Sequence, residues 1–262
     1  MRIGDAREFF SKLGLEAMEQ IQERFAEIEE PLGPGSKFRF TCDADGKCCT
    51  NRDNQPIILT SYDVLRLRKR LAIKSDEFLR KYANVILGAE SRLPMAIVKT
   101  KPNDKYQRCT FLNVTACGVH EDKPLRCRLY PLGRAIDPNE GRSYFFTQKV
   151  PAHCQLGRGR EWTLEEYLKE SEIEVYADWS DKLIEPLMKM DHNKYKGLAL
   201  SHKYTLASVM YDFDFWADKG VREGMLNYPI GDETYMELMQ DGVRVFVESF
   251  VGYRTENKPV IT

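Results

Sequence analysis

The placement of the cysteines constrains this chain more than any other feature of its sequence. The seven are Cys42, Cys48, Cys49, Cys109, Cys117, Cys127 and Cys154. All of them lie between residues 42 and 154 of a 262-residue chain, two are adjacent, and their number is odd. These features argue against a framework of disulfides. In a reducing compartment, cysteines that lie close in sequence are more often metal ligands or catalytic groups.

The residues around these cysteines are typical of ligand loops. A metal-binding loop must turn around its ion, so thiolate ligands usually lie beside glycine and proline. The run 42–49 is rich in turn residues, the segment 109–127 contains Gly118 and Pro124, and Cys154 lies near Pro151. A lone buried cysteine behaves as a small apolar residue, and this is the alternative for Cys127 or Cys154 taken singly. As a set, the seven cysteines predict a metal site.

Three motifs in this order resemble the YkgJ-type cysteine-cluster family, which is described as a zinc- or iron-chelating domain. The family's first motif, C-x-x-C-G-x-C-C, is similar to Cys42-x-x-Asp45-Gly46-x-Cys48-Cys49. Its second motif is two cysteines followed by R-P-x-x-C-R and an aromatic residue before proline. Cys109, Cys117 and the segment Lys123–Pro131 are similar to it, and Cys154-x-x-Gly157-x-Gly159 resembles the family's closing element. The resemblance covers residues 37–160, to within a few residues, and implies that the chain binds zinc or iron.

Two positions depart from the family's pattern. Asp45 stands where the family has its second cysteine, and Lys123 stands where the family has an arginine. A carboxylate can bind zinc or iron, while Asp-Gly is also a common turn pair. Asp45 is therefore either an oxygen ligand or a turn residue. His120 and His153 are the other candidate ligands beside the cysteines.

The residues leave the metal open between zinc and an iron–sulfur cluster. Two structural zinc sites need eight ligands, which the seven cysteines supply together with His120, Asp45 or His153, whereas a four-iron cluster needs four thiolates. Side chains that follow one another in an extended segment point to opposite sides, so Cys48 and Cys49 are expected to serve two ions or two irons of one cluster. Relatives in the resembling family, such as flagellin lysine methylase-like proteins, are associated with an iron–sulfur cluster. A [4Fe–4S] cluster is therefore the favoured cofactor, and zinc is the alternative.

The charge and hydropathy of the chain argue against two classes of partner. The 39 basic and 40 acidic side chains give a net charge of −1, which provides no general attraction to nucleic acid or anionic lipid. No uncharged apolar stretch approaches the roughly 18 residues that a membrane span needs, and the N-terminal residues 1–8 carry charges where a signal peptide is apolar. We expect a soluble cytoplasmic protein with no nucleic-acid or membrane partner. Whether it has a protein partner is left open.

Hydrophobic periodicity predicts an α+β fold, in which a small cysteine-rich metal-binding unit with short strands is packed by N- and C-terminal helices. Residues 5–30 read as an amphipathic helix, 56–59, 95–98 and 143–147 as strands, and 61–71 as a helix. A further helix is predicted from Ser75 through Ile86. The predicted domains are an N-terminal helix over 1–35, the metal-binding domain over 36–160 and a helical C-terminal extension over 161–262.

The C-terminal extension has clear helix signals. Thr163 and Glu166 form a capping box, and Trp162 and Tyr167 are placed as a hydrophobic staple. Helices are predicted near 171–185, 198–219 and 232–250, and breaks are predicted at Pro186, Gly197, Gly220 and Pro229.

Three polar groups outside the cysteines have structural interpretations. The basic run Arg66, Arg68, Lys69 and Arg70 is predicted to be a solvated helix face rather than a contact with nucleic acid. Asp212 and Asp214 are two apart on a predicted helix, so their side chains are expected to point to different sides. His192 and His202 are expected at the surface.

The sequence supports metal binding far better than any reaction. It contains no phosphate-binding glycine loop and no hydrolase nucleophile motif, so catalytic residues are unknown and an enzymatic activity is left open. Two alternatives to a metal-binding protein are an S-adenosylmethionine-dependent protein lysine methylase-like enzyme and a zinc-stabilised protein-interaction module.

Overall fold

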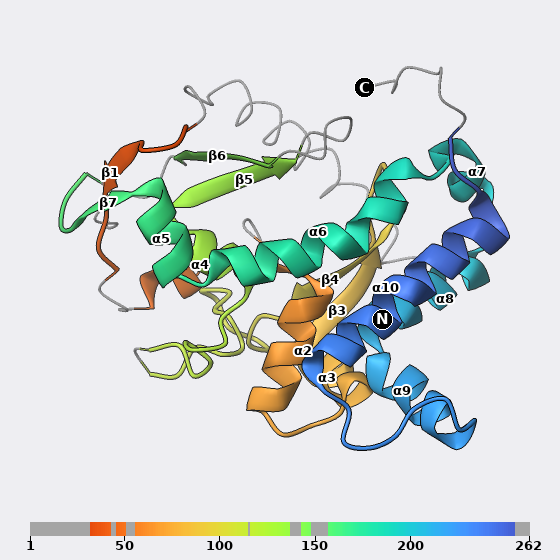
Figure 1. Cartoon of the computed structure of the whole chain (residues 1–262). Helices are drawn as coiled ribbons and strands as arrows, with labels where there is room; N and C mark the ends of the chain where they lie inside the picture. The colour runs from red at the N-terminus through yellow and green to blue at the C-terminus, as the bar shows by residue number, and fades with distance from the viewer. Residues whose placement is uncertain are drawn as a thin grey trace.

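The computed structural model describes residues 32–42, 46–50, 56–114, 116–136, 143–147 and 157–254, and it confirms the α+β class. The helix predicted over 5–30 lies outside these residues, and so do Asp45, His153 and Cys154. Helices pack beside each of the small sheets (Figure 1). Within the described ranges, no helix is long and apolar enough to cross a membrane.

A three-stranded antiparallel sheet and two helices form the first part of the fold. The strand order is β2 (Ile58–Leu59), β4 (Pro94–Val98) and β3 (Ala83–Leu87). The side chains of β4 alternate between buried and half-buried, as expected for a central strand with one covered face. Helix α2 (Ser61–Arg70) follows β2, and helix α3 (Ser75–Tyr82) precedes β3. The strands predicted at 56–59 and 95–98 and the helix over 61–71 are confirmed.

Two helices begin at the capping residues that the sequence predicts. At the start of α2, the Asp63 N–H donates to Thr60 Oγ1 at 3.1 Å, and the Thr60 N–H donates to Asp63 Oδ2 at 2.7 Å. Helix α5 (Leu164–Glu170) begins with the same reciprocal pair at Thr163. The rings of Trp162 and Tyr167 pack edge to face with centroids 5.4 Å apart, so the predicted staple is also confirmed.

Two small antiparallel sheets complete the strand regions. In one, β1 (Lys37–Arg39) pairs with β7 (Glu161–Thr163), which joins the chain before the first cysteine to the chain after the last. In the other, β5 (Leu132–Ile136) pairs with β6 (Ser143–Thr147), the strand predicted at 143–147. Gly133 lies opposite Phe146, and a Cβ at Gly133 would come within 2.3 Å of the Phe146 ring, so only glycine fits there.

The remaining helices build the core behind the cysteine segment. They are α4 (Leu125–Leu129), α6 (Ile173–Lys189), α7 (His192–Gly197), α8 (Leu200–Tyr211), α9 (Phe213–Arg222) and α10 (Asp232–Phe246), the last continued by a π-helical turn at Val247–Val251. Helix α6 crosses the molecule from α4 and α5 to α7, and α10 packs against both α6 and α8 (Figure 1). The rings of Tyr62 on α2 and Tyr176 on α6 pack edge to face with their centroids 4.8 Å apart, so α6 packs against the helix that follows β2.

Three predicted helix boundaries are wrong. Helix α3 ends at Tyr82, and Ile86 lies in β3 because the β-branched segment pairs with β4 instead. Helix α6 continues through Pro186 to Lys189, since burial of Leu183, Pro186 and Leu187 against the core favours the continuous helix over the break. The helix predicted over 198–219 is two helices, α8 and α9, which part at Asp212.

The break at Asp212 comes from polar contacts with α3. The Ser75 hydroxyl donates to Asp212 Oδ1 at 2.9 Å, and the Ser75 N–H donates to Asp214 Oδ2 at 2.7 Å. In return, the Asp214 N–H donates to Ser75 Oγ at 3.1 Å, so helices α3 and α9 cap each other. The expectation that Asp212 and Asp214 point to different sides is wrong, because both carboxylates bind Ser75.

The two C-terminal histidines are also placed differently from the prediction. His192 and His202 are half-buried, and the His202 ring lies 4.9 Å from the ring of Phe250. Burial lowers the pKa of His192, and the positive charges of Arg254 and Lys196 lower it further. Both imidazoles are therefore part of the packing of the C-terminal helices.

Candidate metal centre

The adjacent cysteines lie in a tight turn. Residues Lys47–Cys49 form one turn of 3₁₀-helix, which the Cys49 N–H closes by donating to the Gly46 carbonyl at 3.0 Å. Gly46 has a φ of +71°, in the left-handed region that glycine adopts without strain. Cys48 is exposed and Cys49 is half-buried, so the pair lies at the edge of the core.

A backbone hydrogen bond joins this turn to the second cysteine loop. The Cys109 N–H donates to the Cys49 carbonyl at 2.8 Å, although 60 residues separate the two along the chain. Cys109 is buried, and its backbone also bridges Thr100. The first two motifs are therefore in direct contact.

Cys117 and Cys127 lie near the other cysteines, Cys117 in a turn and Cys127 in a short helix. Cys117 forms an isolated bridge with Leu112, and the next residue, Gly118, donates its N–H to the Phe111 carbonyl at 2.8 Å. Cys127 lies in the middle of α4, which begins directly after Pro124. Both cysteines are half-buried.

The pKa values of two thiols, Cys49 and Cys117, are raised in part by neighbouring cysteines. The pKa of Cys49 is strongly raised, first by a hydrogen bond with Cys48, then by burial and by the charges of Cys48, Cys109 and Cys127. The pKa of Cys117 is raised by burial and by the charge of Cys48, against the opposing effect of the Val119 N–H and Lys123. Deprotonated, these sulfurs repel one another, and a bound cation would remove that cost.

The contact between Cys48 and Cys49 corrects one expectation. The segment is a 3₁₀ turn and not an extended strand, and the two thiols hydrogen-bond to each other. The extended geometry from which we expected Cys48 and Cys49 to serve two ions or two irons of one cluster is therefore wrong, and which metal atoms the two thiols serve stays a prediction.

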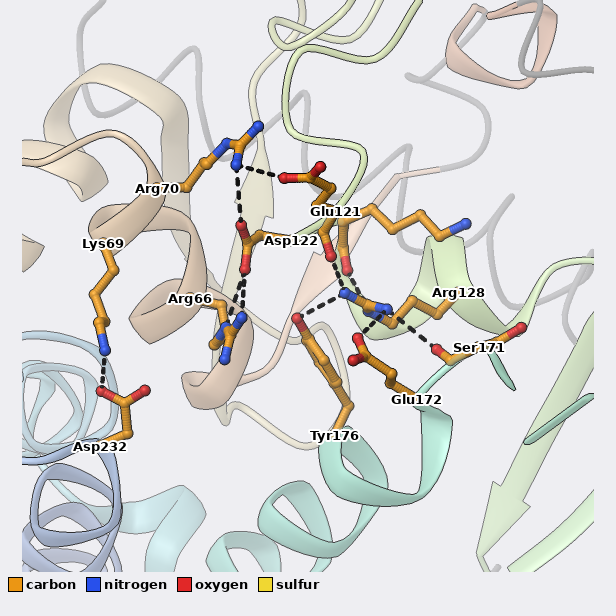
Figure 2. A network of polar contacts seen from close by, with 11 residues as sticks. Arg66, Lys69, Arg70, Glu121, Asp122, Arg128, Ser171, Glu172, Tyr176 and Asp232 are labelled. Carbon is orange, nitrogen blue, oxygen red and sulfur yellow. Dashed lines mark hydrogen bonds and ion pairs between the residues drawn. The ribbon is translucent and has the colours of Figure 1, made fainter. Parts of the chain in front are cut away.

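Helix α4 is held in place by an arginine next to Cys127. Arg128 is buried, and its guanidinium donates to the carbonyls of Lys123, Glu121 and Ser171, to Tyr176 Oη and to the Glu172 carboxylate. Figure 2 shows this guanidinium between the loop before α4 and the start of α6. The contacts fix the part of the loop from Glu121 to Arg128 against the start of α6.

The basic run on α2 binds the same loop. Arg66 donates to Asp122 Oδ1 at 2.7 and 3.0 Å, and Arg70 pairs with Glu121 Oε2 at 2.6 Å (Figure 2). Between them in sequence, Lys69 pairs with Asp232 at 2.6 Å and Arg68 with Asp214 at 3.5 Å. Lys69 and Arg70 are exposed, as predicted for a solvated face, whereas the side chain of Arg68 is largely buried, and each of the four cations has an acidic partner in the fold.

Two further predicted ligands, Cys42 and His120, lie in the described part of the chain. Cys42 is exposed, and its charge acts on Tyr167, whose pKa is raised mainly by burial. Tyr167 in turn donates its hydroxyl to the Tyr130 carbonyl, just after α4. His120 is exposed overall, and its pKa is lowered by partial burial of the ring and by Lys123 and Arg128. A neutral imidazole is the form that binds a metal.

The chemistry of the thiols suits zinc or iron. The thiol side chains that the structure describes lie near one another but do not form a complete coordination shell. Thiolates are soft ligands that suit zinc and iron–sulfur clusters. In the described part of the chain, no three Cys, His, Asp or Glu side chains already stand around one point as metal ligands. The assignment of individual ligands therefore stays a prediction.

The sequence reasoning missed one residue that shapes this region. Asp63 caps α2, and its second oxygen also accepts the Leu125 N–H at the start of α4, at 2.8 Å. The pattern Thr60-x-x-Asp63 is a signal for the first contact. No local pattern in the sequence signals the second.

Fold and site together define an α+β protein in which two cysteine-bearing loops are in direct contact. Residues 41–155 match the family model CxxCxxCC, described as a proposed zinc- or iron-chelating domain. This match agrees with the resemblance that the motifs of the chain predict. No curated protein and no solved structure matches the chain.

Proposed function

We propose that this protein binds one metal centre through the thiolates of its cysteine cluster. The ligands are drawn from Cys48, Cys49, Cys109, Cys117 and Cys127, with Cys42, Cys154, Asp45 and His120 as further candidates. The observation that carries the proposal is the 2.8 Å hydrogen bond from the Cys109 N–H to the Cys49 carbonyl, because it holds the two cysteine loops together.

The interactions among the thiols favour one centre over two separate zinc sites. Cys49 interacts with Cys48, Cys109 and Cys127, and Cys117 interacts with Cys48, so the five form one connected group. Cys49 and the three thiols that interact with it make four, which is the number of thiolates that a cubane cluster takes. A [4Fe–4S] cluster is the occupant we favour, and zinc is the alternative. The cluster would supply one-electron redox chemistry, whereas zinc would hold the loops together.

Location and domain organisation are part of the proposal. A thiol-rich centre of this kind persists in a reducing compartment, which supports the cytoplasm and a YkgJ-type protein. The division into an N-terminal helix over 1–35, a metal-binding domain over 36–160 and a helical extension over 161–262 is compatible with the family match over 41–155.

Metal and sulfide analysis of the full-length protein, purified without oxygen, tests the proposal. Iron and acid-labile sulfide in similar amounts support the cluster, and stoichiometric zinc without sulfide supports the alternative. Cys49→Ser should lose most of the metal, while Met225→Ser, at an exposed sulfur-bearing side chain outside the cysteine cluster, should keep it. Wild-type protein with only traces of zinc, iron and sulfide would refute metal binding.

A further inference from the structure

The carboxylate of Asp63 is buried between the helix that it caps and the helix that carries Cys127. Its side chain has no exposed surface. Oδ2 accepts the Thr60 N–H at 2.7 Å, within α2, and Oδ1 accepts the Leu125 N–H at 2.8 Å, from α4. One carboxylate thus satisfies backbone donors of two helices that are 62 residues apart in sequence.

Helix α4 depends on this contact because it provides no cap of its own. Its N-cap residue is Pro124, which makes no side-chain cap hydrogen bond. Leu125 is the first residue of the helix, and Cys127 follows two residues later. A helix of five residues has little intrinsic stability, so contacts from outside decide where its side chains lie.

The groups that face Asp63 come from three other helices. Arg128 on α4 lowers the pKa of the carboxyl, while the hydroxyls of Tyr176 on α6 and Tyr211 on α8 lie close enough to interact with its charge. Burial is the largest effect and raises the pKa of Asp63 to about 6. A protonated carboxyl accepts fewer hydrogen bonds, so one of the two N–H contacts weakens on protonation.

We propose that Asp63 is a positioning residue of the metal centre, which holds Cys127 beside Cys49 through its hydrogen bond to the Leu125 N–H. The inference rests on the proposed function, because it assigns a role to Asp63 only if the thiols bind metal. Contacts that orient metal ligands from outside the coordination shell are important for affinity, and their loss costs about 10- to 100-fold.

The chain contains a matched control for this arrangement. Asp214 is also a buried carboxylate, and its Oδ2 accepts the N–H of Ser75, the first residue of α3, at 2.7 Å. Helix α3 contains no cysteine. Asp214→Asn therefore removes a comparable cap without touching a helix that carries a thiol.

Titration of the metal-free full-length protein with Co²⁺ tests the inference, since thiolate-to-cobalt charge transfer reports binding by sulfur. We expect Asp63→Asn to bind Co²⁺ about 10-fold more weakly than Asp214→Asn near pH 7.5. The difference between Asp63→Asn and wild type should shrink near pH 5, where Asp63 of the wild type is itself protonated. Because the free energy of unfolding also depends on the protonation of Asp63, circular dichroism must show that both proteins are folded at each pH at which their Co²⁺ affinities are compared.

A second variant removes the same hydrogen bond from the donor side. Leu125→Pro eliminates the N–H at the first helical position, where proline is tolerated, and leaves Asp63 intact. It should also weaken Co²⁺ binding, and it carries the test if Asp63→Asn does not fold. Affinities of both variants equal to that of Asp214→Asn would overturn the inference. A wild type that gives no thiolate–cobalt absorption would instead overturn the proposed function.

Discussion

Arg128→Met removes the guanidinium that fastens the cysteine loop to the core, and the structure gives the size of the effect. The carbonyls of Lys123, Glu121 and Ser171 and the hydroxyl of Tyr176 each lose a donor. The contact with Tyr176 is buried and the three carbonyl contacts are part-buried, and at about 1 kcal/mol net for each hydrogen bond the four contribute about 4 kcal/mol. The Glu172 carboxylate adds little because its side chain is 63% exposed.

Urea-induced unfolding of the metal-free protein, followed by circular dichroism, measures this loss. For a protein of this size, about 4 kcal/mol corresponds to a fall in melting temperature on the order of 10 °C. Arg128→Lys keeps the charge but not the planar fork, so it should recover about half of the stability at most. Methionine in place of arginine preserves much of the side-chain length, which limits the cavity.

Arg244→Met is the control, because Arg244 pairs with Asp241 at 2.8 Å and both side chains are more than half exposed. Its expected cost is below about 1 kcal/mol. If Arg128→Met unfolds within about 1 kcal/mol of Arg244→Met, the buried guanidinium does not fasten the loop and the reasoning fails.

Three further predictions concern protonation, metal removal and the backbone. Burial raises the pKa of Asp63 from 3.8 to about 6, so its contribution to stability is fully present below about pH 4 and is lost as the pH rises through 6, by about 3 kcal/mol. Urea unfolding of the wild type and Asp63→Asn across this range measures it, and a difference that does not change with pH would contradict it. In metal-free protein, iodoacetamide should alkylate the exposed Cys48 well before the buried Cys109, and metal should protect Cys48. Equal labelling of Cys48 with and without metal, read by mass spectrometry, would count against its role as a ligand. Gly159→Ala should cost more than about 2 kcal/mol, since φ is +78° and the new Cβ would lie 2.1 Å from Thr41 Oγ1. A melting temperature within about 2 °C of wild type would show that Thr41 moves aside.

Much of the local structure could be predicted from short stretches of sequence. The capping pairs at Thr60 and Thr163 mark the starts of α2 and α5, and the staple of Trp162 and Tyr167 forms as expected. These features depend on residues within five positions of one another, so the chain adopts them with little help from distant parts of the fold.

The failures have a common physical cause in distant contacts. Ile86 lies in a strand because β4 offers a pairing partner, and the helix over 198–219 is interrupted because Asp212 binds Ser75, which precedes it by 137 residues. Pro186 is accommodated inside α6 because the face on which it lies is buried. In each case tertiary contacts outweigh a local preference of at most a few kcal/mol.

The candidate site divides in the same way. The number and order of the cysteines and the turn residues around them can be read directly from the sequence. They were enough to indicate a thiol-rich metal site and the family whose model residues 41–155 match. Only the tertiary structure decided that Cys109 bonds to the carbonyl of Cys49, that the Cys48 and Cys49 thiols meet, and that Asp63 and Arg128 hold the helix of Cys127. The chemistry of a thiol depends on one residue, so it can be predicted from the sequence. A buried hydrogen bond needs two groups, and whether they meet depends on how the whole chain packs.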